Sequence, residues 1–229
     1  MIRLLWKCVC LALMLGVLGV GFYFFHGVML RPVGRHLIAA DPLEKADYLV
    51  LLAGAPYLTA PEAARLYHEG WAPAILITNQ PRPPGQDALL RLGVPVKDRQ
   101  EVAKDILAAL RVPAQAVHPL PVRSSDVRDE LVAVRQFLAG RASRAVIVIT
   151  PKRQSGRAKH LCTEALAPAI VCSSRPAGDD PFDPAHWWSD WRQVGDVASE
   201  YAALAVDLGR TWWQRFLSPA AVPPAVTIR

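Results

Sequence analysis

The sequence predicts an α/β protein with a three-layer Rossmann-like fold, in which about five mostly parallel strands carry helices on both faces, preceded by one N-terminal transmembrane helix. Two observations lead to this class. Short, continuously apolar runs alternate with helical patterns over most of the chain, as expected when the strands of a parallel sheet are buried on both faces. Before them comes an uncharged apolar run, Cys8 to Phe25, which is long enough to cross a bilayer as one tilted helix.

Basic residues flank this run, with Arg3 and Lys7 before it and Arg31 and Arg35 after it. We interpret the run as an uncleaved anchor, because its apolar length exceeds that of most signal peptides and no small-x-small cleavage pattern follows it directly. A cleaved signal peptide is the alternative. Positive charge is nearly equal on the two sides, so it does not set the orientation. The expected organisation is an anchor at 1–30, a linker at 31–45, one α/β domain at 46–217 and a C-terminal tail at 218–229.

The composition is that of a globular protein, with 52% hydrophobic and 20% charged residues. The formal net charge of +6 raises the question of nucleic acid. The basic residues are scattered, however, and acidic groups lie among them at 126–130 and 179–183. We therefore expect no nucleic-acid partner and interpret the charge as a generic basic surface near anionic lipid.

The first half of the domain alternates strand and helix. The segment 48–53 is continuously apolar and predicts a buried strand, and Pro61 suits the first turn of a helix at 61–69. A second apolar strand at 74–78 runs into a loop at 80–85 that contains three prolines. A helix at 101–110 and a short strand at 116–118 complete this half.

The second half repeats the alternation. A helix is expected at 127–138, where Leu131, Val134 and Leu138 recur at three- and four-residue steps and so form one apolar face. The remaining elements are an apolar strand at 145–150, a helix at 155–166, a strand at 169–172, an exposed loop at 176–184 and a long docking helix at 190–216.

The domain holds two of the four cysteines, Cys162 on an expected helix and Cys172 on the strand that follows. A disulfide between them is geometrically feasible if the domain lies outside the cytosol, and two buried free thiols are the alternative. The spacing of the cysteines and histidines does not match a metal site, so we predict no metal and no cofactor.

Candidate site residues follow the predicted strands, at the edge where open α/β sheets bind ligands. Gly54 allows close approach of the backbone to a ligand or simply forms a turn. Thr78 and Asn79 offer neutral hydrogen-bonding groups or belong to a turn. Ser125 either caps the next helix, as Asp126 can also do, or faces a pocket.

The stretch after the strand at 145–150 gathers the cations Lys152, Arg153 and Arg157 where a helix begins. Helix starts favour negative charge, so cations at this point indicate an anion-binding site, with a solvated basic turn as the alternative. Glu130, on the expected helix at 127–138, is the candidate group for proton transfer. Glycine-rich phosphate loops and a nucleophile elbow are absent from the sequence, so we name no nucleophile.

Several of these segments resemble the YdcF, SanA and ElyC family of bacterial envelope proteins. The resemblance runs from about Asp47 to Trp213 and is carried by 46–54, by 66–67 with 70–78, by 146–150 leading to Arg157 and Ala158, and by Trp187, Trp188, Glu200 and Tyr201. The sequence departs from the family pattern at the polar site. The family has a second glycine beside Gly54, an arginine near Thr59, Ser-Gly-Gly in place of residues 78–80, and a histidine in place of Gln154.

The resemblance implies a bacterial inner-membrane protein with a single span, a domain in the periplasm and a part in peptidoglycan or lipid-carrier metabolism. The first function it suggests is binding, with or without processing, of an anionic small molecule or lipid-linked precursor such as a lipid-carrier phosphate or glycan. The second is a non-catalytic interaction subunit of an envelope complex with other envelope proteins as partners. Binding of S-adenosylmethionine or a nucleotide is a third, suggested by one soluble branch of the family.

Overall fold

The computed structural model describes residues 2–121 and 123–217; the tail expected at 218–229 lies outside them. In this part of the chain, five parallel strands form one sheet in the order β3-β2-β1-β4-β5. The strands are β1 (Tyr48–Leu51), β2 (Ile75–Ile77), β3 (Val117–Pro119), β4 (Ala145–Thr150) and β5 (Val171–Pro176). The predicted α/β class with a parallel sheet is therefore confirmed.

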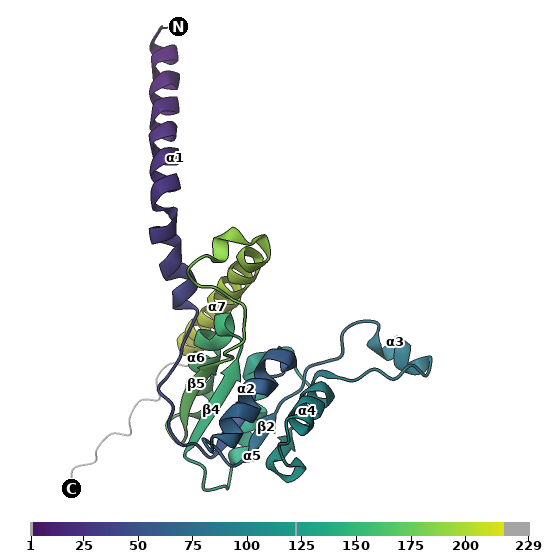
Figure 1. The fold of residues 1–229 in the computed structure, drawn as a ribbon. Helices are drawn as coiled ribbons and strands as arrows, with labels where there is room; N and C mark the ends of the chain where they lie inside the picture. The colour runs from purple at the N-terminus through teal and green to yellow at the C-terminus, as the bar shows by residue number, and fades with distance from the viewer. Residues whose placement is uncertain (1, 122, 218–229) are drawn as a thin grey trace, which may run out of the picture.

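Two helical layers cover the sheet (Figure 1). Side chains alternate between the faces of a strand, so Leu49 and Leu51 join one core cluster whereas Val50 joins the other. The first cluster includes residues of α2 (Pro56–His68) and α4 (Arg99–Ala109), and the second those of α5 (Val127–Leu138) and α6 (Ser155–Leu166). The bounds of α5 and α6 are those that the sequence predicted.

Most boundaries agree with the sequence prediction to within two residues, and two elements differ by more. Helix α2 begins at Pro56 rather than Pro61, because Pro56 takes the first turn, where a proline costs no hydrogen bond, and Pro61 lies inside the helix. Strand β5 runs from Val171 to Pro176 instead of ending at Cys172, since it pairs with β4 along its whole length. As an edge strand, β5 tolerates polar residues that the apolar pattern did not include.

Helix α1 (Ile2–His36) rises away from the domain (Figure 1). Among the described residues no single helix is long and apolar enough to cross a membrane, whereas the segments Leu13–Gly21 and Tyr23–His36, bent by 54° at their junction, meet that requirement as a pair. The sequence predicted one transmembrane helix, whereas the structure contains a bent pair of segments that meets the length and apolarity requirement only when the two are taken together. Pro32, within the last turns of α1, does not end the helix.

The lower end of α1 is attached to the domain. The Trp187 indole N–H donates to the carbonyl of Leu30 at 3.0 Å, and the Tyr201 hydroxyl donates to the carbonyl of Val33 at 2.9 Å. Leu37, only 1% exposed, lies with Phe182 and Trp187 in a third core cluster. The segment 31–45, expected as a linker, therefore begins as helix and packs on the domain.

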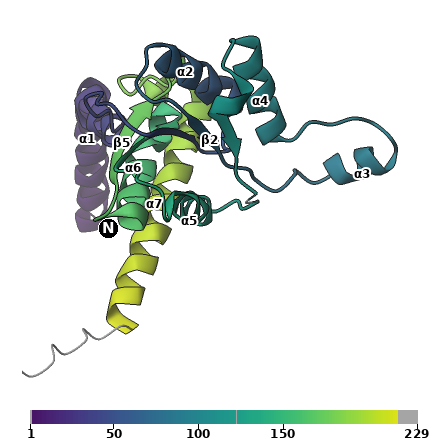
Figure 2. The same ribbon diagram turned by 90° about the horizontal axis from the view of Figure 1, so that it is seen from below.

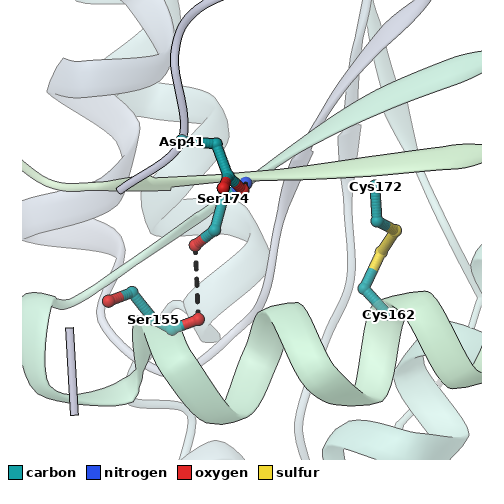
Figure 3. The surroundings of a disulfide bond; sticks show 5 residues. All are labelled: Asp41, Ser155, Cys162, Cys172 and Ser174. Carbon is teal, nitrogen blue, oxygen red and sulfur yellow. Dashed lines mark hydrogen bonds between the residues drawn. A yellow bond between two sulfur atoms is a disulfide. The ribbon is translucent and has the colours of Figure 1, made fainter. Parts of the chain in front are cut away.

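The rest of that segment is hydrogen-bonded to β5 (Figure 3). The Asp41 carboxylate accepts from the backbone N–H of Ser174 at 2.8 Å, and the Asp41 N–H donates to the Ser174 carbonyl at 3.1 Å. Close by, Cys162 on α6 and Cys172 on β5 form a disulfide, with Cα atoms 6.1 Å apart. This separation lies within the usual range for a bridge.

Two further helices leave the compact part of the domain. Helix α3 (Gln86–Arg91) sits at the tip of an arm that projects from the sheet edge, and the end of α7 (Trp191–Leu217) extends past the other helices (Figure 2). The sequence indicated only a loop at 80–85, because α3 is short and buries no residue. Three short 3-10 turns, η1 (Ala114–Ala116), η2 (Lys152–Gln154) and η3 (Trp187–Ser189), complete the described elements.

Candidate functional site

A cavity of about 230 Å³ opens at the carboxyl ends of β1, β2 and β4. These ends meet at one edge of the sheet, which is where parallel α/β proteins bind ligands. The lining combines loop residues that follow strands with the first turns of α4, α5 and α6. It consists of Leu52, Gly54, Gln80, Arg99, Ser125, Val127, Glu130, Thr150, Gln154, Arg157 and Ala158.

Glu130 is the carboxyl group of this cavity, and its residue is fully buried. One oxygen, Oε2, accepts from the backbone N–H of Ala53 at 3.0 Å and from the Thr78 hydroxyl. The other, Oε1, accepts from the Gln80 amide at 3.2 Å. Burial raises the pKa of Glu130, and the hydrogen bonds from Thr78, Ala53 and Gln80 only partly oppose it.

The Thr78 hydroxyl explains how a protonated Glu130 is accommodated. This hydroxyl has one proton but lies within reach of two acceptors, Glu130 and the Leu51 carbonyl at 3.2 Å. When Thr78 donates to Leu51, its oxygen can accept a hydrogen bond from the protonated Glu130 carboxyl. Both protonation states of Glu130 therefore find partners in the same geometry, as a group that exchanges a proton requires.

Thr150, the last residue of β4, contributes a hydroxyl with no partner. The residue is 2% exposed and lines the cavity, and its Oγ1 makes no hydrogen bond within the described structure. A buried hydroxyl that lacks a partner costs about 1 to 3 kcal/mol. A polar ligand atom in the cavity would remove that cost.

Arg157 connects the cavity to α7. Its Nε donates to Asp207 at 2.7 Å, and its Nη1 lies 3.7 Å from Glu200. Both carboxylates belong to buried residues, and burial raises the pKa of Glu200 against the attraction of Arg157. The guanidinium thus lines the cavity and also neutralises charge on the terminal helix. A second cation, Arg99, is hydrogen-bonded to the side-chain carbonyl of Gln80.

The structure brings together five of the residues singled out from the sequence. Gly54, Ser125, Glu130 and Arg157 line the cavity, and Thr78 lies behind Glu130. At Gly54 a Cβ atom would meet the Gln154 side-chain oxygen at 3.5 Å, so the approach is close without being forbidden.

The other three candidates have other contacts. Asn79 is buried and donates to Asp98 at 3.0 Å. The backbone N–H and Nζ of Lys152 donate to Asp180 at 2.7 and 2.6 Å, and Arg153 lies 3.5 Å from Asp196. Asp126 rather than Ser125 caps α5.

Four polar lining residues were not among the site residues predicted from the sequence: Gln80, Arg99, Thr150 and Gln154. The tendency of ligands to bind at strand ends points to Thr150 and Gln154, because Thr150 ends β4 and Gln154 follows it four residues later. Arg99 has no such signal. Arg99 follows the arm that carries α3, at the point where the chain comes back to the cavity. The sequence pattern does not show where in the fold the chain comes back.

The donor set does not point to a metal. Within residues 2–121 and 123–217, no three His, Cys, Asp or Glu side chains lie close enough together to hold an ion. The cavity itself contains one carboxylate, Glu130, beside two guanidinium groups. Such a lining suits a polar or negatively charged organic group.

Fold and cavity together define a parallel α/β protein with a small polar pocket at the strand ends. Comparison of the chain with models of known protein families, and with curated proteins, gave no match.

Proposed function

We propose that this chain is a membrane-anchored envelope protein whose strand-end pocket binds the anionic group of an envelope precursor, such as a lipid-carrier phosphate or a glycan. The observation that carries the proposal is the pocket lining, in which Arg99 and Arg157 accompany the unpartnered hydroxyl of Thr150. Charge-assisted hydrogen bonds from guanidinium groups are the strongest that a protein offers to phosphate. The start of α6 beside the pocket adds the positive end of a helix dipole.

The position of the pocket relative to α1 favours a ligand that is attached to lipid. The N–H of Gly156 donates to the Leu37 carbonyl at 2.9 Å, and the N–H of Ala39 donates to the Ser155 hydroxyl at 2.9 Å. The first turn of α6 is therefore tied to the residues that follow α1. If α1 is the anchor, the pocket lies at the edge of the sheet nearest the membrane.

Two observations support a periplasmic location. The bridge between Cys162 and Cys172 is of a kind that persists in oxidising compartments. The resemblance to the YdcF, SanA and ElyC envelope proteins implies the same compartment. Fusion of alkaline phosphatase to the C-terminus, which is active only outside the cytosol, tests this assignment, and an inactive fusion that is expressed at full length would oppose it.

Processing of the ligand would require a proton-transfer group, and Glu130 is suited to that role. Its raised pKa keeps the proton available nearer neutral pH, and both of its protonation states are hydrogen-bonded. We propose binding as the primary function and assign to Glu130 the proton transfer of any subsequent reaction.

Replacement of Thr150 by valine tests the binding site. The hydroxyl has no partner, so Thr150→Val preserves shape, removes the cost of an unpaired buried group and should raise the melting temperature by a few degrees. Loss of one hydrogen bond to a charged ligand group should weaken binding about tenfold. The exposed Thr163→Val on α6 is the matched control and should bind as wild type does.

The measurement is calorimetric titration of the full chain in detergent with inorganic phosphate, a prenyl phosphate and S-adenosylmethionine. Binding of either phosphate, weakened by Thr150→Val alone, supports the proposal. Binding of S-adenosylmethionine alone would favour the nucleotide alternative. If none of the three binds wild type, the anion site is wrong for these ligand classes.

A non-catalytic interaction subunit is the second candidate, and exposed apolar side chains on α7 favour it. Val206 is 53% exposed and Leu208 is 56% exposed. Such side chains on one helix are typical of a surface that binds another protein. Co-purification of an envelope protein that is lost in Val206→Ser together with Leu208→Ser, while ligand binding is unchanged, would support this reading.

A further inference from the structure

Trp188, in the turn η3 that precedes α7, lies beside the end of the apolar part of α1. The Trp188 ring packs edge-on against the His26 ring, with 5.7 Å between centroids, and a Cβ atom at Gly27 would lie 3.7 Å from it. Trp191 follows on the first turn of α7 and is 78% exposed. In Figure 1 the segment that leads into α7 is the part of the domain that reaches furthest along α1.

The direction of α1 relative to these tryptophans is fixed by packing. At Gly34 a Cβ atom would lie 2.7 Å from both the Pro184 carbonyl oxygen and the Trp187 ring, so only glycine permits this approach. The Trp187 indole and the Tyr201 hydroxyl each bond a carbonyl of α1. The part of α1 that follows the 54° bend is consequently packed against the start of α7.

The length of the apolar run sets the level at which the tryptophans lie. From Cys8 to Phe25 the run has 18 residues, which at 1.5 Å per residue is about 27 Å, close to the thickness of a hydrocarbon core. His26, and with it Trp188, therefore follows directly after the hydrocarbon region if α1 crosses the bilayer. This is the level of the headgroups, where tryptophan is enriched in membrane proteins.

We propose that Trp188 and Trp191 form a second contact with the bilayer, in which the start of α7 rests in the headgroup region beside α1. The partner is the lipid surface itself, recognised by indole rings, and the inference rests on the proposed anchor. Trp191 is too exposed to contribute to the domain core, and α1 also presents exposed apolar side chains at Val28 and Met29, which are 68% and 63% exposed.

The charges around this surface suit headgroups in general rather than anionic lipid alone. Arg192 lies over the Trp191 ring at 5.4 Å, and Arg31 is exposed on α1. Asp183, paired with His186, and Asp190 at the start of α7 place negative charge nearby. With both signs present, the contact depends on the indole rings, and its strength should change little with the fraction of anionic lipid.

Spin labelling of the full chain in nanodiscs of phosphatidylcholine and phosphatidylglycerol tests the contact. Trp191→Cys and Leu92→Cys are made in a background in which Cys8 and Cys10 are replaced by alanine. Both positions are 78% exposed, and Leu92 lies on the arm beyond α3, so it serves as the matched control. A third variant, Leu18→Cys, reports whether α1 is in the bilayer.

The readout is the collision rate of the label with oxygen, which concentrates in lipid, relative to a water-soluble nickel chelate. We expect a several-fold higher oxygen-to-nickel ratio at 191 than at 92, with the highest ratio at 18. A bilayer signal at 18 with equal, water-like signals at 191 and 92 would overturn the interfacial contact and leave the anchor standing. A water-like signal at 18 would overturn both.

Discussion

The buried carboxyl of Glu130 makes a defined prediction about the pH dependence of stability. Burial raises the pKa of this group above the 4.5 of an exposed glutamate, so over a range of pH above 4.5 the folded protein keeps a proton that the unfolded chain has lost. In that range the stability of the wild type falls as the pH rises, by up to about 1.4 kcal/mol per pH unit for one group.

Glu130→Gln removes this pH-dependent contribution to stability, but it also loses the hydrogen bond with Gln80. The glutamine oxygen can accept from the N–H of Ala53 and the hydroxyl of Thr78, but its amide group then faces the amide of Gln80. Gln80 cannot turn over without losing its bond from Arg99. Near pH 4.5 we therefore expect the variant to be less stable than wild type by about 1 kcal/mol.

As the pH rises towards neutrality, this difference should shrink, because only the wild type loses stability through Glu130. The assay is urea unfolding of the full chain in non-ionic detergent from pH 4.5 to 8, followed by tryptophan fluorescence, with the exposed Glu44→Gln as control for the loss of one carboxyl. Subtracting the wild-type curve cancels the other groups, including Glu200, whose raised pKa adds a slope of the same sign. Parallel curves for wild type and Glu130→Gln would refute the reasoning.

Three further outcomes concern contacts that hold the domain together. Arg157→Ala should lower the free energy of unfolding by about 3 kcal/mol, because the buried Glu200 loses its ion pair and the buried Asp207 keeps the longer one to Arg128 at 3.4 Å. A melting curve like that of wild type would contradict the ion pair. Reduction of the Cys162 to Cys172 bridge, which closes a separation of 10 residues, should cost about 2 to 3 kcal/mol, and chemical unfolding with and without reductant measures it. Gly156→Ala should destabilise the fold by about 1 to 3 kcal/mol, because the added Cβ would lie 2.8 Å from the Leu37 carbonyl oxygen. Gly195→Ala, in open space on α7, is the control and should be neutral or stabilising. Equal effects of the two changes in thermal melts would exclude the steric explanation.

The fold could be predicted from the sequence because its signals are local. The apolar runs that became β1 and β4, and the three- and four-residue spacing of Leu131, Val134 and Leu138, record burial on the sheet directly. The extent of β5 was missed, because an edge strand with Ser173 and Ser174 has no such pattern. Its length follows instead from pairing with β4, which is information held in another part of the chain.

The candidate site was predicted only in part, because side-chain partners are a tertiary property. The sequence gathered three cations at the start of α6, but it could not indicate that Asp196, Glu200 and Asp207 on α7 lie opposite them. The start of α6 is therefore less basic than its sequence indicates, and of its three cations Arg157 is the one that lines the proposed anion pocket. Thr150 was missed for the opposite reason. The sequence shows a threonine at the end of a strand, but it does not show that the hydroxyl lacks a hydrogen-bond partner in the folded protein.

The attachment of α1 to the domain restricts how far the domain, and the pocket in it, can move relative to the end of α1. A free coil over the 15 residues from 31 to 45 would give the domain a reach of about 20 Å around the end of α1. The hydrogen bonds of Leu30, Val33, Leu37 and Asp41 remove that freedom. The pocket therefore keeps a fixed position along the axis of the last turns of α1 and a fixed orientation about that axis. One residue inserted into α1 after Phe25 would turn the pocket by about 100° and move it by about 1.5 Å along the axis. If α1 is the anchor, as proposed, its length sets the distance of the pocket from the membrane, and a lipid-linked ligand would have to present its polar group at that distance.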